Sequence, residues 1–217
     1  MHMLAALVQN MPCANSEYAR VTFMTFLCTL PPILPCPNCV KEAPIIFMAE
    51  FDKHNVRETY LTLDLNVLMC DIHNGVNRKL HKPEMELAVS LARAVQLRSN
   101  VNTKLVWDFL IMSARSIRPA TRIMDYKNCI GCLAVLLKLL NHPTLADKAA
   151  MIAQQIPASK SQPVYGNQAE MLTFLYKFYE QWHREHSMPC PSEAEFVSKL
   201  TYASQGRSKS PLGLGDE

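Results

Sequence analysis

The chain has 217 residues, 49% of them hydrophobic, which is enough for one large domain or two small ones. Its formal net charge is only +3 and it has no long basic run, so a nucleic acid is not the expected partner. The longest apolar runs, such as residues 132–140, are too short to span a bilayer. The first ten residues contain no Lys or Arg of the kind that opens a signal peptide, so we expect a protein of the cytoplasm or nucleus.

The chain is expected to be all-α, because glycine is scarce, with six in all, and no alternating strand pattern persists. The first clear helix is predicted over residues 15–30. Its apolar residues recur at helical spacing and are Phe23, Phe26, Leu27 and Leu30. The prolines that follow are expected to end it.

A C-x-x-C pair comes next, Cys36 and Cys39, which follows Pro35 and opens a new predicted helix. Amide N–H groups at a helix N-terminus stabilise a thiolate, and the thiolate is the nucleophile of disulfide exchange. The pair therefore has the spacing and the place of a redox centre. The same spacing is found in half of a zinc site and in structural cysteines. Spacing alone does not distinguish a redox pair from these two alternatives.

Residues 60–80 carry one apolar stripe and are predicted to form a helix that stops before a proline. The stripe consists of Leu61, Leu65, Leu68, Ile72, Val76 and Leu80. Beside it, His73 and Asn77 lie four residues apart and share a face. Lys79 and Lys82 add positive charge at the C-terminal end. Such a helix suits a ligand with a flat ring system and a phosphate, and a solvated polar face is the alternative.

The two features together resemble the Erv/ALR family of FAD-linked sulfhydryl oxidases. The family signature is a proline-preceded C-x-x-C followed by a helix reading H-N-x-V-N-x-x-L-x-K-P, which residues 73–83 match at every position. The resemblance covers residues 1–83 and implies a small helical bundle, usually a homodimer, with FAD in its mouth. It implies that electrons pass from client protein thiols to the C-x-x-C disulfide, then to FAD and then to O2, which gives H2O2.

The resemblance also implies roles for single residues. Cys36 would accept electrons from the client, and Cys39 would lie next to the flavin. The residues that would line the FAD site are His73, Asn74, Val76, Asn77, Leu80 and Lys82, with Lys79 or Lys82 near the phosphate.

The sequence departs from the family pattern at several aromatic positions. The tryptophan and histidine of the first family helix would fall at Met1 and Ala5, a later tryptophan is Leu68, and the aromatic residue after the C-x-x-C is Ala43. Each aromatic face lost costs about 1 kcal/mol of contact energy. A non-catalytic, oxidase-like binding module that has lost FAD is therefore the alternative to an enzyme.

Residues 84–203 are expected to form a second helical domain, and residues 204–217 a disordered tail. A second C-x-x-C pair, Cys129 and Cys132, is predicted at a helix start capped by Asn128. This pair could be a shuttle disulfide that feeds the first pair, or two buried core residues, or half of a four-cysteine zinc site with the first pair. A tryptophan-containing helix before it faintly resembles the order expected in an oxidase unit, a tryptophan helix followed by a C-x-x-C, and a degenerate second copy is one interpretation.

Capping boxes at Thr144, Asn167 and Ser192 predict further helix starts. His183 and His186 could ligate a metal, but carboxylates beside them predict ordinary surface pairing, so no metal site is expected. Compact oxidases with an extra helical domain resemble those of large DNA viruses, which make disulfides in reducing compartments. A viral chain would act in the infected cell or in the virion.

Overall fold

The computed structural model of the chain describes residues 1–34, 37–97, 101–114, 123–156 and 168–202. The regular elements in these ranges are all helices, which confirms the predicted all-α fold. In chain order they are α1 (His2–Gln9), α2 (Cys13–Thr29), the 3-10 helix η1 (Pro31–Ile33), α3 (Pro37–Lys53), α4 (Val56–Thr59), α5 (Leu65–Lys79), α6 (Leu87–Leu97), α7 (Thr103–Ala114), α8 (Ile123–Leu139), α9 (Pro143–Gln155), α10 (Gln168–Glu185) and α11 (Glu193–Tyr202). None of these helices has the length and apolar character needed to cross a membrane.

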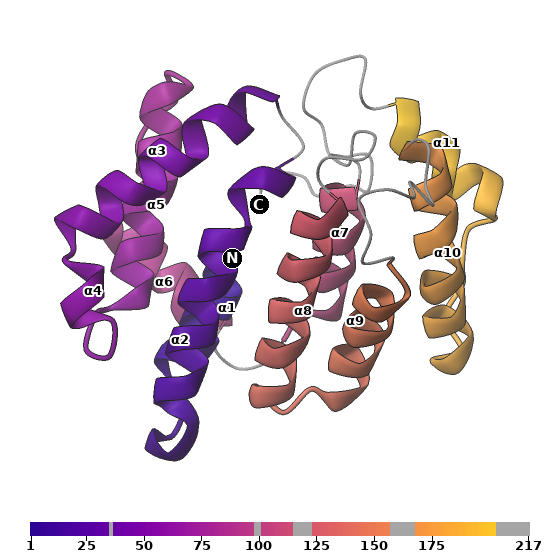
Figure 1. Cartoon of the computed structure of the whole chain (residues 1–217), viewed down its shortest axis with the longest axis horizontal. Coiled ribbons are helices and arrows are strands. Elements are labelled where there is room, and N and C mark those ends of the chain that lie inside the picture. The colour runs from indigo at the N-terminus through magenta and orange to yellow at the C-terminus, as the bar shows by residue number, and fades with distance from the viewer. Residues whose placement is uncertain (35–36, 98–100, 115–122, 157–167, 203–217) are drawn as a thin grey trace.

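The helices form two groups that meet at α2 and α8 (Figure 1). In the first group, α1 packs against α2, α5 and α6, and α3 packs against α5. In the second group, α8 packs closely on α9, and α10 contacts α7 and α11. Figure 1 shows α2 and α8 side by side at the centre of the molecule.

One hydrophobic core runs through both groups. The predicted stripe of α2 is fully buried in it, and the ring of Phe26 lies 5.6 Å from that of Phe109 on α7. Helix α6, which follows residue 83, packs on α1 and α5. The domain boundary at residue 83 stays a prediction.

Helix α5 is shorter than predicted at its start because Asp64 caps it. The Asp64 carboxylate accepts hydrogen bonds from the backbone N–H groups of Asn66 at 2.8 Å and Val67 at 3.3 Å, which fixes Leu65 as the first helical residue. Leu61 therefore lies outside the helix and is exposed, whereas Leu65, Leu68 and Ile72 of the same stripe are buried. Leu80 follows the end of α5 and is half exposed.

The predicted start of α8 at Asn128 is wrong, because the helix begins at Ile123. Ile123, Tyr126 and Ile130 form a buried stripe that carries the helix back past Asn128, and the Tyr126 hydroxyl donates to the carbonyl of Leu110 at 3.0 Å. The second C-x-x-C therefore lies in the middle of a helix.

The other helix starts have mixed outcomes. Helix α9 begins at Pro143 rather than after a Thr144 cap, since proline suits the first helical position. The Ser192 box is confirmed, with the Ser192 N–H donating to Glu195 Oε2 at 3.0 Å and the Glu195 N–H to Ser192 Oγ at 3.4 Å. Asn167 and residues 204–217 lie outside the described residues.

Candidate active site

A cavity of about 700 Å³ lies between α3 and α5, and the start of α1 reaches it. Helix α3 contributes Cys39 to its wall, and α5 contributes His73 and Val76. Most of the wall is apolar. The volume falls within the roughly 300–1,000 Å³ typical of small-molecule and cofactor sites.

Cys39 occupies the first turn of α3, which begins at Pro37. This position confirms for Cys39 that it lies at the start of a helix, where backbone N–H groups face an incoming charge. Cys36 lies outside the described residues. Cys39 is therefore the member of the pair that the structure places in the cavity wall.

The structure divides the predicted cofactor residues into two sets. The set that lines the cavity comprises His73, Val76, Lys79 and Leu80. The other set consists of Asn74, Asn77 and Lys82, which do not line it.

Two asparagines of α5 hold the segment that follows the helix. The buried Asn74 amide donates to the carbonyl of Met85 at 2.9 Å and accepts from its N–H at 2.7 Å. The Asn77 amide donates to the carbonyl of Pro83 at 3.0 Å. These side chains hold residues 83–85 against α5 and do not line the cavity.

Rings that the sequence pattern did not predict line the cavity. Phe47 lies one helical turn beyond Ala43, and both are in the wall. His2 lies beside Met1, the position of the missing family tryptophan, and it also lines the cavity. The i, i+4 spacing from Ala43 was the available signal for Phe47, because residues at that spacing share a helix face.

Lys79 supplies the cationic group of the cavity wall. Its Nζ lies 3.0 Å from Glu42 Oε2, and this ion pair joins α5 to α3. Both side chains remain partly exposed, so the pair is a weak one. A phosphate at Lys79 would therefore compete with the Glu42 carboxylate.

His2 and His73 contact each other in the same wall. His2 Nε2 lies 3.2 Å from His73 Nδ1, and the ring centroids are 5.4 Å apart. Burial, together with nearby positive charge, lowers the pKa of His2 to about 4 and also lowers the pKa of His73. Both rings are therefore neutral at pH 7.

A polar cluster ties α3 to α5 outside the cavity. Asp71 Oδ2 accepts from Lys53 Nζ at 2.7 Å and lies 2.8 Å from His54 Nε2. Glu50, His54 and Asp71 are the one trio with metal-binding spacing among the described residues. Because Lys53 and Arg78 already neutralise its carboxylates, the trio is a salt-bridge network of the fold.

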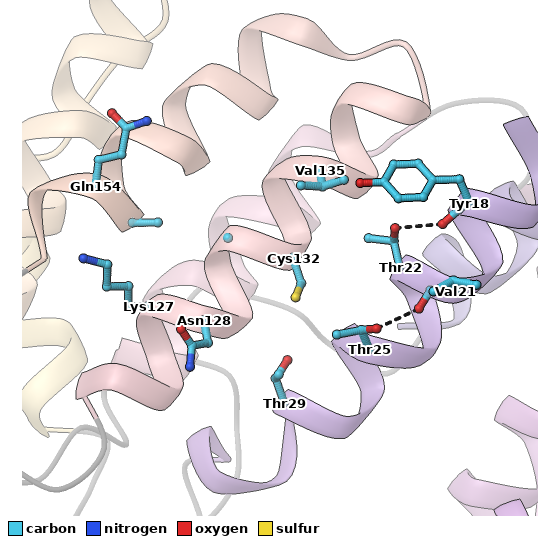
Figure 2. Close-up of a pocket in the computed structure, with 12 residues that line it drawn as sticks. Tyr18, Val21, Thr22, Thr25, Thr29, Lys127, Asn128, Cys132, Val135 and Gln154 are labelled. Carbon is cyan, nitrogen blue, oxygen red and sulfur yellow. Dashed lines mark hydrogen bonds between the residues drawn. The ribbon is translucent and has the colours of Figure 1, made fainter. Parts of the chain in front are cut away.

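Cys132 of the second C-x-x-C borders a different cavity, of about 850 Å³, between α2, α8 and α9 (Figure 2). Cys132 points from α8 toward Thr25 and Thr29 of α2. Cys129 is fully buried, and burial raises its pKa to about 12. Both residues are thiols in the structure.

The four-cysteine zinc alternative is not supported. Cys39, Cys129 and Cys132 are all among the described residues, and they do not come together as a set of metal ligands. The physical reason is their placement, since Cys39 lines the cavity of α3 and α5 whereas Cys132 faces α2 and Cys129 is buried in the core.

The structure is thus an all-α fold with a largely apolar cavity whose wall includes Cys39 from the first turn of α3. The model of the Erv1 / Alr family matches residues 1–97, so this part of the chain is similar to that family. No curated protein and no solved structure matches the chain. The resemblance to viral oxidases therefore stays a prediction.

Proposed function

We propose that the protein is an FAD-dependent thiol oxidase that forms disulfides in client proteins. The observation that carries the proposal is the place of Cys39, in the wall of the same cavity that His73 and Val76 line. The Erv1 / Alr family, to which residues 1–97 are similar, is one of FAD-linked sulfhydryl oxidases.

The cavity residues fit FAD. Phe47 and His73 offer rings for a flat ring system, and Ile72 and Val76 offer apolar surface. Lys79 offers positive charge for a phosphate. When bound, FAD would supply the chemistry that takes two electrons and two protons from a dithiol and delivers them to O2, giving H2O2.

The cysteines would carry out the exchange with the client. A client thiolate attacks the Cys36–Cys39 disulfide and forms a mixed disulfide with Cys36, and the second client thiol then displaces Cys36. The client leaves with a new disulfide, and the protein holds two thiols. Cys39 lies in the cavity wall, which suits the role of the flavin-proximal cysteine.

An absorption spectrum of the purified protein and an oxygen electrode test the proposal. We expect a yellow protein that consumes O2 in the presence of a dithiol. Cys39→Ser should abolish O2 consumption, whereas Cys28→Ser, at an exposed cysteine outside the cavity, should leave it unchanged. A colourless wild-type protein that takes up no added FAD, or full turnover in Cys39→Ser, would refute the proposal.

The homodimer implied by the resemblance is part of the same proposal. Light scattering coupled to size exclusion measures the mass in solution, and a mass equal to one chain would contradict it.

A further inference from the structure

The hydrogen bond between His2 and His73 links two residues that lie 71 positions apart in the sequence. His2 is the first residue of α1, and His73 is in the middle of α5. Both line the cavity that contains Cys39. The contact therefore lies within the candidate site.

The bond engages a particular atom of His73. A neutral imidazole has one nitrogen that donates and one that accepts. His2 Nε2 lies at Nδ1 of His73, so Nδ1 is engaged within the protein and Nε2 is the nitrogen left for a ligand. One of the two contacting nitrogens must carry the proton and the other must accept it, so the bond couples the tautomer of His73 to that of His2.

We propose that His2 is a positioning residue, which sets the ring orientation and tautomer of His73 and thereby favours ligand binding in the cavity. The inference rests on the proposed function in that the ligand is FAD. It assigns a role to α1 that the H-N-x-V-N motif of α5 does not contain. It also explains how the cavity keeps an ordered ring at its α1 side although Met1 and Ala5 stand where the family has a tryptophan and a histidine.

Two variants separate the hydrogen bond from the ring itself. In His2→Gln, the amide nitrogen reaches about as far as Nε2 of histidine, so the bond to His73 is kept and the ring is lost. In His2→Phe, the ring is kept and the bond is lost. The inference predicts that FAD affinity is kept in His2→Gln, which keeps the bond, and is reduced in His2→Phe, which loses it.

FAD titration of the apoprotein, followed by flavin fluorescence, measures the effect. His2→Phe should raise the dissociation constant by roughly two- to tenfold, the worth of one hydrogen bond, and His2→Gln should stay near wild type. In a His73→Phe background, His2→Phe should have no further effect, because the partner is already gone. Wild-type affinity in His2→Phe, equal losses in both variants, or additive losses in the double variant would each overturn the inference.

A second measurement does not depend on FAD. Nitrogen-15 NMR of the imidazoles reports the tautomer of each histidine in the flavin-free protein. The His73 signals should show one dominant tautomer in wild type and in His2→Gln, and a mixture in His2→Phe. If the wild-type protein binds no FAD, the proposed function fails. The role of His2 is tested separately, because His73 NMR signals that are unchanged in His2→Phe would overturn it.

Discussion

Gly75 of α5 lies so close to Ile46 of α3 that an added Cβ would be 2.6 Å from Cγ2 of Ile46. That methyl group is attached to a branched Cβ, so it cannot move away without shifting α3. We expect Gly75→Ala to lower the free energy of unfolding by about 1–2 kcal/mol, since overpacking outweighs the better helix propensity of alanine. Urea denaturation followed by circular dichroism measures this change.

Gly131 provides the matched control on α8. An added Cβ there meets nothing within 4 Å. Gly131→Ala should therefore stabilise the protein by about 0.5–1 kcal/mol through helix propensity alone. If Gly75→Ala and Gly131→Ala change the free energy of unfolding in the same direction, the close approach of α3 and α5 is not the reason for glycine at position 75.

Asn74 and Asn77 should differ in their effect on stability. Asn74→Ala leaves the N–H and the carbonyl of Met85 without their buried partner, so we expect a loss of about 1–3 kcal/mol. Asn77→Ala removes one solvent-accessible bond to Pro83 and should cost less than about 1 kcal/mol. Urea midpoints of the two variants compare them directly, and an equal loss would contradict the supporting role of Asn74.

The sequence predicted the helices whose apolar stripe and end signals agree. For α2, the buried residues and the prolines after it point to the same segment, and the prediction is confirmed within two residues at the start. For α8, a local cap signal at Asn128 competed with the stripe through Tyr126, and burial of the stripe prevailed. Local signals therefore fail where tertiary packing continues a helix past them.

The sequence predicted only those residues of the candidate site that belong to a local motif. His73 and Val76 follow from the motif of α5, and both line the cavity. Asn74 belongs to the same motif, but its side chain faces Met85, a contact that spacing along one helix does not reveal. His2 could not be predicted, because its contact with His73 depends on how α1 packs against α5.

Cys129 should resist alkylation in the folded protein. With a pKa raised by burial to about 12, only about one molecule in 10,000 carries the thiolate at pH 8. Iodoacetamide should label the exposed Cys28 in the native protein and reach Cys129 only in denaturant, which peptide mass spectrometry measures. A native Cys129–Cys132 disulfide peptide would instead favour the shuttle interpretation.

Asp71 should make stability depend on acid pH. Burial alone would raise the pKa of Asp71, but hydrogen bonds from Lys53 and His54 outweigh it and hold this pKa below its ordinary value of 3.8. The stabilisation of the folded state by the ionised Asp71 is therefore fully present at a pH above the pKa of Asp71 in the unfolded chain. It is lost as the pH falls through the lower pKa of Asp71 in the folded protein. Asp71→Asn should lose about 1 kcal/mol at pH 7.

The pH profile is the distinguishing measurement for Asp71. The difference in unfolding free energy between wild type and Asp71→Asn should shrink once the pH falls below about 4. The exposed Asp52, which forms no ion pair with another described residue, supplies the control variant Asp52→Asn. A difference that stays constant down to pH 2 would contradict the role of the folded-state ionic contacts.

Glu42 should oppose binding of a phosphate-bearing ligand at Lys79. Glu42→Gln removes the carboxylate 3.0 Å from Lys79 Nζ, which leaves the cation free for phosphate. We expect FAD to bind up to about fivefold more tightly, the upper range for a partly exposed ion pair, and the gain should decrease at high salt. Glu84→Gln, which removes a carboxylate paired with Arg78 outside the cavity, should leave the affinity unchanged. Fluorescence titrations of the apoprotein at low and high salt measure both variants, and weaker FAD binding in Glu42→Gln would show that this ion pair builds the cavity rather than competing for its ligand.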